Sequence, residues 1–155
     1  MFLIRVLRER VGRGLRAGII AAAATAGVLI GFGIARGAPL QPLNAVAHLV
    51  IGTRAYLADG FRSGVTPLAL ALHVLAAVVW AELFVLITPR LRGLTLFVAA
   101  LVFAGAIFLV DVVLLARGPR PALGEALTAG EQGIVYLVFG LALALALQPR
   151  PDSRA

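Results

Sequence analysis

Four apolar stretches, each long enough to cross a lipid bilayer, dominate this sequence. A helix needs about 20 residues to cross a hydrocarbon core of about 30 Å. Each stretch ends at Arg, Gly or Pro, which stop helices or stay at the membrane boundary. We therefore expect spans at about residues 17–35, 64–88, 94–116 and 130–147.

The composition agrees with a membrane protein. The chain has 155 residues, of which 61% are hydrophobic and 14% are charged, whereas a soluble domain is about 45–50% apolar and about 25% charged. A soluble core of this size could not bury so much apolar surface. This excludes a disordered chain, the usual basic nucleic-acid-binding domain and most soluble enzymes. We expect an all-α integral membrane protein, a four-transmembrane-helix bundle that forms a single membrane domain over residues 1–155.

The Arg residues indicate an orientation. All fourteen basic residues are Arg, and nine of them lie before the first span, between the second and third spans, or after the fourth. With the acids included, this side carries +7 and the other side +2. The positive-inside rule then places both termini in the cytoplasm of a bacterial inner membrane, where Arg meets anionic lipid headgroups. The first apolar stretch is too long for a signal peptide, so we expect an uncleaved span.

Two connections are predicted to hold short helices. Asn44 is a candidate helix cap, and about residues 45–58 would form a helix that is too short to span the membrane. An interfacial or partly re-entrant position is expected for this helix. Residues 117–130 contain enough Leu and Ala for a short surface helix.

Three ionisable side chains lie within the spans, namely His73, Glu82 and Asp111. A charged Asp at membrane depth costs about 2.5–3.5 kcal/mol on insertion scales, so these residues are the first functional candidates. His73 and Glu82 are nine positions apart and face nearly opposite sides of one helix. The helical rise places His73 and Asp111 in the same half of the membrane, which allows a contact between them if their helices pack together. Such a contact would serve either a proton relay or polar pocket, or only a bond between helices.

Glu82 is expected in the other half of the membrane. There Arg16 or Arg92 could reach its carboxylate by extending along the helix surface. A structural ion pair is the simplest role for it.

Enzymatic and cofactor motifs are scarce. His48 provides a second imidazole, but neither haem nor a zinc or copper site is indicated by the spacing of His48, His73 and Asp111. There is no Cys, and the sequence has no phosphate loop or nucleophile elbow. We therefore expect no enzyme activity and no cofactor.

Gly27 and Gly31 lie four residues apart in the first span. Small residues at this spacing allow two membrane helices to approach closely. Packing within the bundle is the favoured role, and dimerisation of separate chains is the alternative.

Three stretches carry a family resemblance. They are the Asn44-Ala-x-x-His48 motif with Gly52, the run from His73 to Trp80 with Glu82, and Asp111 followed by Arg120-Pro121 and Tyr136. Together they resemble an uncharacterised family of small four-span bacterial inner-membrane proteins. The resemblance implies a cluster of Asn44, His48, Asp111, Arg120 and Tyr136 on the outer side, and it implies no activity. The sequence departs from the family pattern at Val112 and in the loop over residues 117–130, which lacks a Phe.

The favoured function is a non-enzymatic accessory or interaction subunit of a membrane complex, bound to a partner membrane protein or to further copies of itself. The shortage of catalytic groups and the small-residue helix faces favour it. The alternative is an oligomeric transporter or channel-like protein that uses a polar site at His73 and Asp111.

Overall fold

The computed structural model describes residues 2–88, 90–114 and 126–149, and helices dominate this part of the chain. Four of these helices are long and apolar enough to cross a membrane. The all-α fold with four membrane-length helices is therefore confirmed. The four helices are α1 (Phe2–Ala35), α4 (Thr66–Ile87), α5 (Gly93–Leu109) and α6 (Ala129–Leu147).

The ends of these helices differ from the expected spans in two places. α1 begins at Phe2 rather than near residue 17, so the Arg-rich segment continues the first span as one helix. α5 ends at Leu109, and the chain continues as the π-helix η3 (Val110–Leu114). The surface helix expected over residues 117–130 lies mostly outside the described residues.

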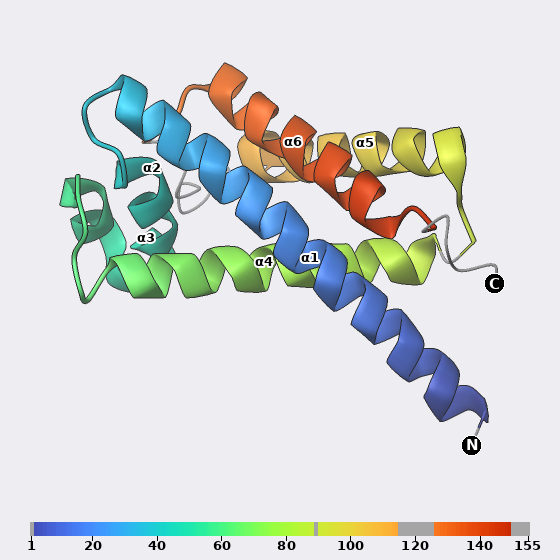
Figure 1. Cartoon of the computed structure of the whole chain (residues 1–155). Helices are drawn as coiled ribbons and strands as arrows, with labels where there is room; N and C mark the ends of the chain where they lie inside the picture. The colour runs from blue at the N-terminus through green and yellow to red at the C-terminus, as the bar shows by residue number, and fades with distance from the viewer. Residues whose placement is uncertain (1, 89, 115–125, 150–155) are drawn as a thin grey trace.

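The four long helices pack in the order α4, α1, α6, α5. α1 crosses α4 and also packs along α6, and α5 packs against α6 (Figure 1). α4 and α5 meet mainly through aromatic rings, because the Phe103 ring centroid lies 5.2 Å from that of Phe84 and 6.1 Å from that of Trp80. Side chains from all four helices therefore share one core, although α4 and α5 contact each other less than the three packed pairs do.

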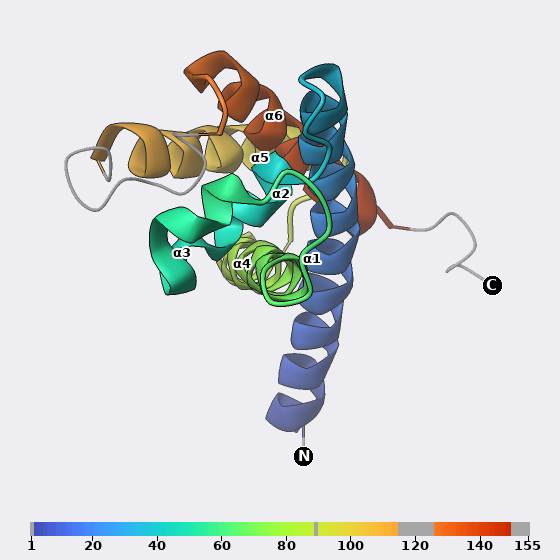
Figure 2. The same cartoon turned by 90° about the vertical axis from the view of Figure 1, so that its left-hand side faces the viewer.

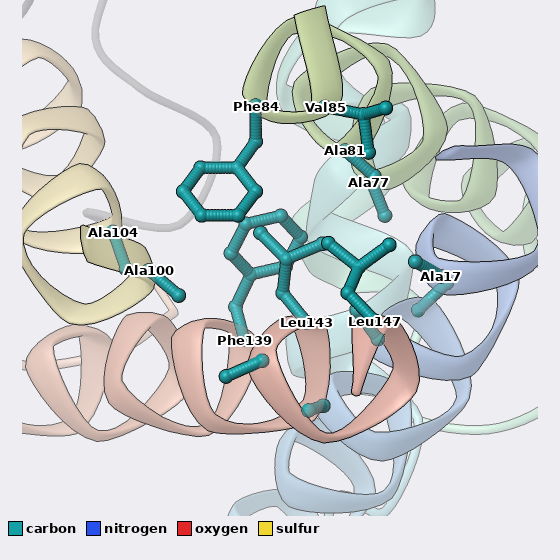
Figure 3. Close-up of a cluster of buried hydrophobic side chains, with 14 of the residues drawn as sticks. Ala17, Ala77, Ala81, Phe84, Val85, Ala100, Ala104, Phe139, Leu143 and Leu147 are labelled. Atoms are coloured by element: carbon teal, nitrogen blue, oxygen red, sulfur yellow. The ribbon is translucent and has the colours of Figure 1, made fainter. Parts of the chain in front are cut away.

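The core combines small residues at the helix contacts with large side chains in the space between them (Figure 3). Alanines allow the helix backbones to approach closely in a membrane. Phe84 and Phe139 point into the space between the helices and fill it. The labelled alanines of this cluster, all at most 6% exposed, are Ala17, Ala77, Ala81, Ala100 and Ala104.

The close helix contacts use other glycines than the pair expected from the sequence. A Cβ on Gly18 would lie 2.6 Å from Val78 Cα, and a Cβ on Gly140 would lie 3.0 Å from the Ala100 carbonyl oxygen. Gly27 and Gly31 are exposed, and an added Cβ would meet no described atom within 4 Å. Close packing inside the described bundle is thus made by Gly18 and Gly140 and not by Gly27 and Gly31.

The connection between α1 and α4 is a series of short turns at one end of the bundle (Figure 2). It begins at Gln41, and the positive φ of Gly52, +66°, separates its two halves. The segments are α2 (Gln41–Asn44), η1 (Ala45–Ala47), α3 (His48–Ile51) and η2 (Gly52–Leu57).

Asn44 does not cap a helix with its side chain, contrary to the sequence-based expectation. Its Nδ2 donates to the carbonyl oxygens of Ala58, at 2.7 Å, and Gly60, at 3.0 Å. These bonds tie the start of the connection to its end. The difference arises because the helical turn begins before Asn44, which leaves the amide free to reach across the segment.

Candidate functional site

His73 lies on α4 and bonds to α1. Its Nε2 is 3.0 Å from Thr25 Oγ1 and 3.1 Å from the Ala22 carbonyl oxygen. A carbonyl oxygen only accepts, so the contact with Ala22 places the imidazole proton on Nε2. Thr25 donates its own hydrogen to the Ala21 carbonyl at 2.8 Å, and its oxygen can therefore accept from His73. This arrangement joins α4 to α1 in the middle of two spans.

Asp111 lies in the π-helix after α5 and bonds to α6. The Tyr136 hydroxyl donates to Asp111 Oδ2, and the Phe108 ring packs edge-on against Tyr136 with centroids 5.7 Å apart. A π-turn is wider than an α-turn and is frequent at functional sites in proteins. Here it carries the carboxylate that accepts from the neighbouring helix. Asp111 and Tyr136, two of the five residues in the cluster that the family resemblance implies, are therefore in direct contact.

Arg36 follows α1 and bonds to the start of α6. Its guanidinium pairs with Glu131 and also donates to the Ala126 carbonyl. Glu131 is held in place by Thr128, since Glu131 Oε2 accepts from the Thr128 backbone N at 2.9 Å and from its Oγ1 at 2.8 Å. Thr128 and Glu131 form a capping box at the N-terminus of α6. The ion pair thereby fixes the end of α1 to a capped helix.

Glu82 lies directly over the backbone of α1. A Cβ on Gly14 would fall 2.4–2.8 Å from its carboxylate atoms, so a larger residue at position 14 would require the flexible Glu82 side chain to move. Within the described part of the chain, no ion pair joins Glu82 to Arg16 or Arg92. The expected ion pair is replaced by close contact with a glycine backbone.

His48 and Asn44 lie four residues apart on the connection between α1 and α4. The His48 ring packs against Tyr56 with centroids 4.8 Å apart. His48 Nδ1 and Asn44 Oδ1 are buried and have no hydrogen-bond partner among the described residues. The Asn44 amide cannot be reversed without directing Oδ1 at two carbonyl oxygens, so Oδ1 remains an acceptor without a donor.

The described hydrogen bonds of the candidate residues are thus distributed over several contacts and do not join these residues into one network. His73 and Asp111 bond to different helices, and no described hydrogen bond joins them. Among the described residues, no group of three or more His, Cys, Asp and Glu side chains could hold a metal ion. Arg120 lies outside the described residues.

The polar contacts follow the packing of the helices. Among the described residues, each of the three packed pairs of long helices has at least one contact between two polar side chains. His73 joins α4 to α1, Arg36 joins the end of α1 to α6, and Asp111 joins the extension of α5 to α6. The chemistry that this arrangement supports is therefore hydrogen bonding and ion pairing between neighbouring helices.

Three participants were not among the sequence-based candidates: Thr25, Arg36 and Glu131. Thr25 is uncharged and is therefore not among the ionisable candidates, although it is the one polar side chain within the expected first span. Arg36 and Glu131 lie at the ends of the expected first and fourth spans, where charged side chains are ordinary. The Thr128-x-x-Glu131 spacing of a capping box could have indicated how Glu131 is oriented.

Comparisons with protein-family models, with curated proteins and with solved structures return no match for this chain. The four long apolar helices therefore support a small four-span membrane protein, and no family is identified.

Proposed function

We propose that this chain is a non-enzymatic accessory or interaction subunit of a complex in the bacterial cytoplasmic membrane. The observation that carries the proposal is the use of the polar side chains within the bundle. His73, Asp111 and Arg36 each bond across a different helix contact. Interhelical hydrogen bonds of this kind contribute about 0.6–2 kcal/mol each in membranes, and this role accounts for them without a reaction.

A second observation concerns the surface of α1. Ala23, Gly27 and Gly31 repeat every four residues and are exposed along one face. Small residues that face lipid add little packing energy, whereas small residues at this spacing allow another helix to approach closely. We therefore expect the partner, a different membrane protein or a second copy, to contact α1 here.

The orientation forms part of the proposal. The Arg-rich start of α1 and the connection between α4 and α5 carry seven of the fourteen Arg residues and only one acidic residue. The positive-inside rule then places both termini in the cytoplasm. Attaching a reporter enzyme to either terminus tests this, because activity on the outer side of the membrane would contradict it.

The experiment for the subunit role compares two exposed glycines. Gly27→Ile should abolish association of the native complex in mild detergent, because the larger side chain keeps a second helix away. Gly105→Ile is the matched control, since Gly105 is also exposed and an added Cβ meets no described atom within 4 Å. Recovery of the unmodified protein as a lone monomer, or equal behaviour of the two variants, would argue against the role.

A transporter or channel built on His73 and Asp111 has less support, because the two side chains bond to different helices. His73→Ala and Asp111→Asn in a flux assay address it directly. Unchanged flux in both variants would remove this alternative.

A further inference from the structure

The connection between α1 and α4 has one side fixed to the bundle. Ala47 and Ala55 are fully buried and pack with Ala69, which lies in the first turn of α4. The two bonds from Asn44 close the segment onto itself. The segment therefore cannot turn its other side inward without breaking this packing.

The other side of the connection carries large apolar side chains that no described residue covers. In Figure 2, α3 forms the outer edge of this end of the molecule, away from α1. Leu49 is 72% exposed, Leu57 is 77% exposed and Phe61 is 69% exposed. These fractions equal or exceed those of side chains in the middle of the spans, such as Val102 at 68%.

The contact with Ala69 sets the depth of the segment. Because Ala69 lies within one turn of the start of the span, the segment is level with the boundary between headgroups and acyl chains. Apolar side chains on a non-spanning helical segment enter this boundary, and a neighbouring Arg meets the lipid phosphates. Arg54 is exposed on the same segment.

We propose that residues 48–61 form an interfacial anchor whose Leu49, Val50, Leu57 and Phe61 side chains insert among the acyl chains of one leaflet. The occupant of this surface is lipid. The anchor would hold the end of α1 and the start of α4 at a fixed depth in the membrane. It does not depend on the proposed subunit role, and it applies to the isolated protein.

The absence of Cys from the chain makes a direct test possible. Leu57→Cys and Asp59→Cys, each labelled with an environment-sensitive fluorophore, are reconstituted into vesicles of phosphatidylethanolamine and phosphatidylglycerol. Both positions are exposed and lie two residues apart, so neither substitution disturbs the core. We expect emission at 57 to shift to shorter wavelength and to be quenched by nitroxides on the lipid acyl chains. The label at 59 should instead be quenched by aqueous iodide.

Two outcomes would overturn the anchor. Quenching of the label at 57 by iodide would place the segment in water. Protection of that label from both quenchers would show that protein, such as a second copy, covers the surface. Leu49→Cys provides an independent position if labelling at 57 fails, with the same expected result.

Discussion

Gly18 is the position where a single substitution should most disturb the packing of α1 against α4. An alanine there would place its Cβ 2.6 Å from Val78 Cα, while ordinary contact begins at 3.4 Å. The opposing atom belongs to a helix backbone and cannot rotate away, so the two helices must separate locally, by about 0.8 Å if ordinary contact is to be restored. A gap of 0.5–1 Å forfeits about a quarter to a half of the dispersion energy of each facing pair.

The expected cost follows from the residues at this contact. Ala21, Ala22 and Ala81 are at most 2% exposed, so they lose close neighbours when the helices part. Overpacking of a tight core costs about 1–3 kcal/mol, and we expect Gly18→Ala to lower the free energy of unfolding by that amount. Gly27→Ala introduces the same methyl group on the same helix where no described atom lies within 4 Å. It should be neutral, or stabilise by up to about 1 kcal/mol through helix propensity.

Both variants can be compared by unfolding in mixed micelles with increasing sodium dodecyl sulfate, at dilutions that keep the protein monomeric. The fluorescence of Trp80, the one Trp in the chain, reports the transition because its ring packs against Phe103 in the core. Equal stability of the two variants, or greater damage from Gly27→Ala, would refute the assignment of Gly18 to the close contact.

Five further substitutions test three of the polar contacts. His73→Leu should cost about 0.6–2 kcal/mol in the same unfolding assay, and Thr25→Val should cost less because His73 keeps its second acceptor; the reverse order would contradict the bond geometry. Tyr136→Phe removes the described donor to a carboxylate and should cost about 1–3 kcal/mol, more than Asp111→Asn, whose amide oxygen still accepts. Asn44→Ala leaves two carbonyls unpaired, and hydrogen exchange should quicken in the connection but not in α6; unchanged exchange would show that these bonds are dispensable.

The four spans could be predicted because crossing a bilayer requires only length and hydropathy, which the sequence displays directly. The sequence did not allow us to predict which helices pack against one another. α4 is apolar on all sides, so no stripe in its sequence indicates which face meets α1. The proximity of His73 and Asp111 was allowed by their depth, but depth does not fix the rotation of a helix about its axis. That rotation directs His73 to α1.

The role of each glycine could not be predicted either, because it depends on where the helices cross. Gly27 and Gly31 have the familiar spacing, but the crossing of α1 over α4 falls at Gly14 and Gly18. Where two helices cross depends on their angle and on the connection between them, and neither can be read from spacing. By contrast, the proximity of Asp111 and Tyr136, taken from the family resemblance, is observed in the structure.

The packing order also bears on how the chain assembles as it is synthesised. α1 and α4 can dock as soon as both have entered the membrane, because they contact each other directly. α5 enters next, and α6, the helix against which it packs most, is made after it and lies between α5 and α1 (Figure 1). The contacts of α6 with α1 and α5 therefore form only after α6 has inserted. A chain truncated before α6 would leave α5 with its aromatic contacts to α4 but without its larger packing surface.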